Sequence, residues 1–201
     1  MNHSPPHEPA AFERSDNQAG RAGEFAKLLN SNMNNITLES KIDFLGREKF
    51  VKFTNTAEFL MLSQPLRELL ATKGVYSNSR ELPYVATSGQ LRDIGKGLIE
   101  FGKNDIRDQF CIDTENSNRI VSICPDHTDL INSSFENYIN CIYALQYFSQ
   151  EIVGKRVLGD YRKNNTRYAR KLLDMFNEIE GDINLYPIWA VQVDEREAGV
   201  L

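Results

Sequence analysis

The sequence predicts an α+β fold, a single domain in which helices flank a largely antiparallel or mixed β-sheet. The first observation behind this prediction is a pair of short apolar segments, 109–113 and 119–123, separated by the polar turn 114–118. This pattern is typical of a β-hairpin. The second observation is the segment after Ser134, in which apolar residues recur at steps of three and four and therefore share one face of a helix.

Composition places the chain among ordinary globular proteins. Its 201 residues are 41% hydrophobic and 25% charged, which suits one domain with a real core. Residues 1–35 are polar, so we expect a flexible segment at 1–35 and the α+β domain at 36–201. There is no apolar run of about 18 residues and no secretory signal pattern, and the three cysteines suit buried free thiols. We therefore expect a cytoplasmic protein that does not enter a membrane.

The hairpin belongs to a longer series of predicted strands. Residues 98–102 form a third apolar segment, and a polar turn leads from them into 109–113. Three strands in series, about ten residues apart, favour an antiparallel meander. Further towards the N-terminus, residues 36–62 mix apolar and charged side chains and predict strand and loop segments.

Four helices follow from start and stop signals. Ser63 and Pro65 predict a helix start, with Ser63 as the cap, and Gly74 predicts the stop. Ser133 or Ser134 caps a long helix over 135–153. After a charged linker at 154–166, helical spacing resumes at Tyr168 and stops at Gly181, and Pro187 opens a last helix with Gly199 near its end.

The net charge of −5 is spread unevenly. Between Leu98 and Glu136 there are eight acidic and three basic residues, a balance of 3 − 8 = −5. Acidic groups in turns are expected to be exposed, so they could steer a basic partner; alternatively, they form solvated faces that neutralise one another. The candidate partner contacts are Asp105, Asp108, Glu115, Asp126 and Asp129. The basic run 155–171 has few aromatic residues and acidic neighbours, so we expect no nucleic-acid binding.

Residues able to support catalysis are few. His127 is the only histidine outside residues 1–35, and it follows Cys124 at a spacing that could begin a metal site, with Asp126 and Asp113 as carboxylates. No second Cys or His pair stands at ligand spacing, and no nucleophile elbow accompanies the histidine. We therefore expect no metal, no cofactor and no catalytic residues. A small metal-dependent enzyme centred on His127 is the alternative from another class.

Several segments resemble, in order, the SUKH superfamily of bacterial immunity proteins, especially its fourth subfamily. The most specific is Asn132-Ser133-Ser134-Phe135-Glu136, which leads into the predicted long helix. The complete set comprises 64–70 with Gly74-Val75, 98–102, 111–113, 130–138, and 188–189 with 197–201. The chain departs from the family pattern in its long polar N-terminus and in residues 76–97.

The resemblance implies a mixed or antiparallel sheet flanked by helices. It also implies an antidote in a contact-dependent or polymorphic toxin system. Such a protein binds a cognate toxin domain, often a nuclease, and blocks it stoichiometrically without catalysing a reaction. The same fold also serves as a general cytoplasmic protein-binding scaffold, which is the second reading that the resemblance allows.

Overall fold

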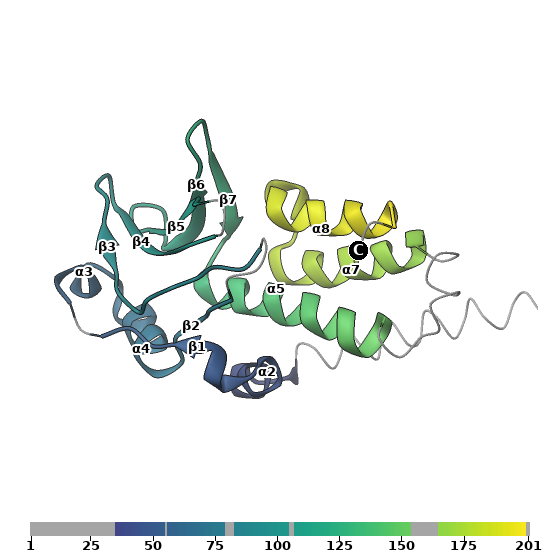
Figure 1. The fold of residues 1–201 in the computed structure, drawn as a ribbon, viewed down its shortest axis with the longest axis horizontal. Coiled ribbons are helices and arrows are strands. Elements are labelled where there is room, and N and C mark those ends of the chain that lie inside the picture. Colours follow the sequence, from purple (N-terminus) through teal and green to yellow (C-terminus); the bar gives the residue numbers. More distant parts are fainter. Residues whose placement is uncertain (1–34, 55, 79–82, 105–106, 154–164, 200–201) are drawn as a thin grey trace, which may run out of the picture. The chain divides into compact units, whose positions relative to one another are not determined.

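The computed structural model describes residues 35–54, 56–78, 83–104, 107–153 and 165–199 (Figure 1). The chain divides into two units at Ile36, and the description here concerns the second, Thr37–Leu201. The expected flexible segment 1–35, apart from Asn35, and most of the expected linker at 154–166 lie outside the described residues. The described residues form six α-helices and two antiparallel sheets, which confirms the α+β prediction.

The larger sheet is an antiparallel meander in which every strand pairs with its neighbours in sequence (Figure 1). It consists of β3 (Arg92–Asp93), β4 (Leu98–Lys103), β5 (Gln109–Asp113), β6 (Arg119–Ile123) and β7 (Thr128–Asn132). The predicted hairpin is therefore confirmed, with Asp113 paired to Arg119 across the turn. Ser117 and Asn118 in that turn have positive φ angles of 60° and 58°, a conformation that asparagine tolerates better than most residues.

The N-terminal part of the domain corrects one prediction. Among the described residues of 36–62, only β1 (Phe50–Val51) is a strand, paired with β2 (Val75–Tyr76), while α2 (Leu38–Leu45) and α3 (Ala57–Leu60) are helical. Thr37 caps α2 by accepting a hydrogen bond from the Ser40 amide. The helix has only eight residues, so its stability comes from tertiary packing of its apolar face, which sequence periodicity detects poorly at this length.

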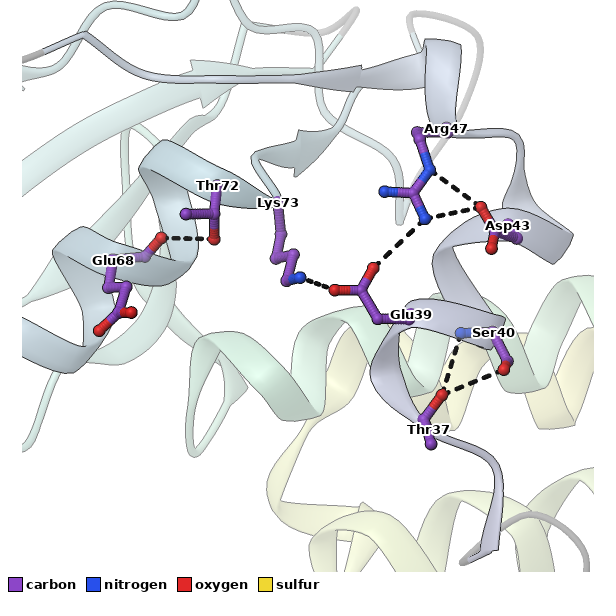
Figure 2. A network of polar contacts seen from close by, with 8 residues as sticks. All are labelled: Thr37, Glu39, Ser40, Asp43, Arg47, Glu68, Thr72 and Lys73. Atoms are coloured by element: carbon purple, nitrogen blue, oxygen red, sulfur yellow. Dashed lines mark hydrogen bonds and ion pairs between the residues drawn. The ribbon is translucent and has the colours of Figure 1, made fainter.

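An ionic network joins α2 to the end of α4 (Gln64–Thr72). Glu39 pairs with Lys73 and, at 3.3 Å, with Arg47, which also contacts Asp43 at 2.8 Å (Figure 2). Glu39 and Arg47 are about half exposed, so each pair contributes less than about 1 kcal/mol. The buried side chain of Ile42 therefore matters more for holding α2 in place.

The predicted helix α4 is confirmed in position, but its cap differs. Ser63 occupies the N-cap position, yet its side chain makes no capping bond. Its hydroxyl instead accepts a hydrogen bond from Asn118 Nδ2 at 3.3 Å, so it connects the start of α4 to the hairpin turn. At the other end Gly74 has φ 84°, and a Cβ there would lie 2.5 Å from the Val51 carbonyl oxygen. Only glycine fits this stop without strain.

The C-terminal helices agree with the sequence prediction. They are α5 (Phe135–Tyr147), which continues as a π-helical segment (Phe148–Val153), α7 (Asn165–Glu180) and α8 (Pro187–Glu197). Helix α5 packs against α2, α7 and β7, and α8 packs against α7 and β7. Pro187 stands in the first turn of α8, where its missing amide hydrogen costs nothing.

An aromatic cluster forms the centre of the core. Phe101 of β4, Phe135 and Tyr138 of α5, and Trp189 of α8 are each at most 3% exposed. The Phe101 and Phe135 ring centroids are 5.6 Å apart, and those of Tyr138 and Trp189 are 6.3 Å apart. Tilted and edge-on aromatic pairs at these distances are favourable beyond the area they bury. The cluster therefore joins the sheet to both helices.

The start of α5 gives a direct test of helix capping. Ser134, not Ser133, is the N-cap residue, and its Oγ accepts a hydrogen bond from the Asn137 amide at 3.1 Å. We expect Ser134→Ala to lower the free energy of unfolding by about 1 kcal/mol, because one amide of the first turn loses its partner. Denaturant unfolding measures this loss. Ser133→Ala is the comparison variant: its Oγ accepts from the Asn137 side chain at 3.0 Å, and a larger loss in this variant than in Ser134→Ala would contradict the assignment.

Candidate functional site

The candidate partner contacts lie at two ends of the sheet instead of in one patch. Glu115 lies in the β5–β6 turn, whereas Asp126 lies in the β6–β7 turn and Asp129 follows that turn on β7. In an antiparallel meander successive turns alternate between the two ends, and a five-residue strand spans about 16 Å. Asp108, immediately before β5, lies at the Asp126 end, and Asp105 lies outside the described residues.

Asp108 corrects the expectation that all five acidic groups are exposed. It is only 8% exposed. Its carboxylate accepts a hydrogen bond from Asn104 Nδ2 at 2.9 Å, and its amide donates to Asn104 Oδ1 at 2.8 Å. This reciprocal pair closes the loop between β4 and β5, and both residues are buried. Asp108 therefore has a structural role in the loop, and it presents little of its charge to a partner.

The β6–β7 turn gathers three side chains with metal-ligating atoms. We call Cys124, His127 and Asp129 the β6–β7 turn cluster; their ligand atoms all lie within 4.8 Å of one another. Within the cluster, His127 Nε2 is 3.0 Å from Asp129 Oδ2. The backbone produces this proximity, because the Cys124 amide donates to the His127 carbonyl at 3.0 Å and Ile123 pairs with Thr128.

The alternative reading of a module centred on His127 named the wrong carboxylates. Among the described residues, the cluster contains Asp129 in place of Asp126 and Asp113. Asp113 ends β5 at the opposite end of the sheet, where its carboxylate accepts from Arg119 and Asn116, each at 2.9 Å. Asp126 is adjacent to His127 in the sequence and was therefore favoured. However, side chains two residues apart along an extended segment point to the same side, so Asp129 lies next to His127 instead.

The cysteines are all protonated thiols at neutral pH. Burial raises the pKa of Cys111 to about 12 and the pKa of Cys141 well above its ordinary value. The pKa of Cys124 is also raised, first by burial and then by a hydrogen bond to the Asp108 carboxylate. A thiol nucleophile works as the thiolate, so these surroundings do not activate a cysteine for covalent chemistry.

Thiol labelling checks this arrangement. Cys124 is partly exposed, whereas Cys111 and Cys141 are fully buried. We expect one thiol per chain to react with an alkylating reagent at pH 8 under native conditions, more slowly than a free cysteine because its pKa is raised. All three should react in denaturant. Peptide mass spectrometry identifies the labelled residue, and rapid native labelling of Cys111 or Cys141 would contradict the burial.

The hairpin turn adjoins exposed apolar side chains that sequence reasoning did not single out. Leu60 and Met61 are 61% and 48% exposed at the end of α3. They precede Ser63, whose hydroxyl contacts Asn118 in the β5–β6 turn. We call Leu60, Met61, Glu115 and Asn118 the hairpin-tip surface. Exposed apolar residues beside polar groups are typical of protein-binding surfaces.

Among the described residues, no helix has the length and apolar character needed to cross a membrane. The chain matches no protein-family model, no curated protein and no solved structure.

Proposed function

We propose that this protein is an immunity protein that binds a cognate bacterial toxin domain and neutralises it stoichiometrically. The observation that carries the proposal is the convergence of the segments that resemble SUKH immunity proteins. Phe101 comes from the segment 98–102, Tyr138 from 130–138, and Trp189 from 188–189. These distant segments meet in one aromatic cluster.

Convergence matters because a shared fold constrains residues that pack together. Segments that resemble a family by chance need not lie in contact, whereas a common core requires contact between residues far apart in sequence. Tyr138 touches the rings of both Phe101 and Trp189, so three of the resembling segments share one packing unit. The role as an antidote follows from analogy with the family, since one fold can serve several functions.

The hairpin-tip surface is our first candidate for the toxin contact. Leu60 and Met61 offer apolar area that loses its water in a complex, and Glu115 offers negative charge from the β5–β6 turn, which Asn118 links to Ser63. A nuclease is the toxin class that suits this chemistry, because its phosphate-binding surface is basic and attracts carboxylates. Asp126 and Asp129, at the other end of the sheet, form the second candidate face.

Co-expression with a candidate toxin domain, sought first among the genes beside this one, tests the proposal. We expect the unaltered protein to protect cells from that toxin and to bind it in a purified mixture. A general scaffold of the same fold would give no protection, so protection separates the two readings. Absence of both binding and protection would sink the proposal.

Two double variants then locate the contact. We expect the variant Met61→Asp with Glu115→Lys to weaken binding by about 30-fold or more, as loss of an interface hot spot does. The matched variant, Asp126→Lys with Asp129→Lys, changes two exposed or half-exposed residues at the other end and should bind within about threefold of the parent, as rim substitutions do. If the second variant bound weakly and the first bound as the parent does, the toxin contact would lie at the β6–β7 end of the sheet.

A further inference from the structure

The β6–β7 turn cluster is held together by backbone pairing. Cys124 and His127 face each other across a turn closed by a 3.0 Å hydrogen bond from the Cys124 amide to the His127 carbonyl. Asp129 is on β7, where it pairs with Ser122 of β6. His127 and Asp129 are two residues apart along this extended segment and therefore point to one side of it.

The cluster has nearly the size that a tetrahedral zinc ion needs. Zinc binds sulfur at about 2.3 Å and nitrogen or oxygen at about 2.0 Å, which puts ligand atoms roughly 3.5 Å apart. The three ligand atoms already lie within 4.8 Å of one another. The side chains of His127 and Asp129 are 58% and 33% exposed, so small rotations can close the remaining distance.

The chemistry of the three groups selects the ion class. A thiolate, an imidazole and a carboxylate together suit zinc and similar divalent transition metals, whereas calcium and magnesium prefer oxygen ligands alone. The two-residue spacer between Cys124 and His127 is also within the range found between paired zinc ligands. The exposed His127 leaves a path for the ion from solvent.

The buried carboxylate of Asp108 lies close to Cys124 of the cluster. Asp108 is held by Asn104 at 2.9 Å, and its carboxylate contributes to the raised pKa of the Cys124 thiol. Its negative charge attracts a cation to the cluster, and a bound cation offsets the repulsion between this carboxylate and the Cys124 thiolate.

From this geometry we propose that Cys124, His127 and Asp129 bind one divalent transition-metal ion of the zinc class, with water in the fourth position. The Cys124 thiol releases its proton to solvent as the metal–sulfur bond forms. The bound ion fixes the β6–β7 turn against the end of the sheet. The proposal does not rest on the immunity function, and it requires no catalysis.

Cobalt titration of the full chain tests the site. The starting protein for this experiment, called the parent, carries His3→Ala and His7→Ala. These two histidines lie outside the described residues, and replacing them prevents them from competing for the ion. We expect one cobalt ion per chain, a thiolate-to-cobalt charge-transfer band, and displacement of cobalt by zinc. Cys124→Ser should abolish the band, and Asp129→Asn and His127→Ala should weaken binding.

Matched controls keep this test decisive. Asp126→Asn removes a carboxylate from the same turn and Cys111→Ser removes a thiol elsewhere in the sheet, so both should bind cobalt as the parent does. Circular dichroism verifies that each variant is folded. Absence of the band, its persistence in Cys124→Ser, or its equal loss in Asp126→Asn would overturn the proposal.

Discussion

Trp189→Ala is expected to lower the free energy of unfolding by about 3–5 kcal/mol, the range for removing a fully buried large aromatic side chain. Trp189 is 0% exposed, and its ring lies 5.2 Å from Phe176 and 6.3 Å from Tyr138. The substitution also removes the indole N–H, which donates to the Ile131 carbonyl at 2.9 Å and to Asn132 Oδ1 at 3.1 Å.

Urea unfolding followed by circular dichroism measures this loss, since Trp189 is the only tryptophan and fluorescence would change with it. Trp189→Phe keeps a ring but deletes the donor, and we expect an intermediate loss of about 1–3 kcal/mol. Val191→Ala on the same helix is the control, because Val191 is 47% exposed and should change stability by less than about 0.5 kcal/mol. Equal losses in Trp189→Ala and Val191→Ala would contradict the central position of Trp189.

Asn132→Asp is expected to make folding strongly dependent on pH. Asn132 is 0% exposed, and its amide nitrogen donates to the Glu180 carboxylate and to Cys141 Sγ. An ionised carboxyl of the same shape would have no hydrogen to donate and would face the charge of Glu180. Burial and like charge both raise the pKa of the introduced carboxyl above its unfolded value of about 3.9.

The raised pKa determines whether the free energy of unfolding rises or falls with pH. The variant keeps near-parental stability below pH about 4, where the introduced carboxyl is protonated and can still donate. It loses stability as the pH rises through the folded pKa, and at pH 7 we expect a deficit of about 3 kcal/mol, as for a buried unpaired charge. Denaturant unfolding at several pH values measures the curve.

Asn140→Asp is the control with the opposite sign. Lys41 Nζ donates to Asn140 Oδ1 at 2.8 Å, so a carboxylate there would face a cation. We expect this variant to be at least as stable as the parent at pH 7 and to lose that advantage as the pH falls through the lowered pKa of its carboxyl. If both variants followed the same pH trend, the proposed role of Glu180 beside Asn132 would be wrong.

Elements with strong local signals were predictable from the sequence. The hairpin, α5 with a serine cap, α7 with its stop at Gly181, and α8 opened by Pro187 each depend on turn residues, caps or periodicity within a short segment. Helix α2 was missed because its eight residues carry little periodic signal and depend on packing against α5. Local chemistry therefore specified the longer elements, and tertiary contacts specified the short helix α2.

The candidate sites were less predictable because they depend on strand register. From the sequence alone, Asp108 is expected to be an exposed acidic residue in a loop. In the structure it is buried and forms reciprocal hydrogen bonds with Asn104. His127 sits near Asp126 in sequence, but the alternation of β7 brings Asp129 to it instead. Nothing within 57–63 indicates that this segment adjoins the β5–β6 turn, which is linked to it by the Ser63–Asn118 hydrogen bond.

Titration of the cognate toxin's activity with purified protein tests the central claim most directly. A stoichiometric inhibitor predicts that activity falls linearly and reaches zero at about one equivalent when both proteins are well above the dissociation constant. Loss of activity at far less than one equivalent would mean catalytic inactivation, and undiminished activity at a large excess would mean no recognition. Either of these two results would contradict neutralisation by stoichiometric binding.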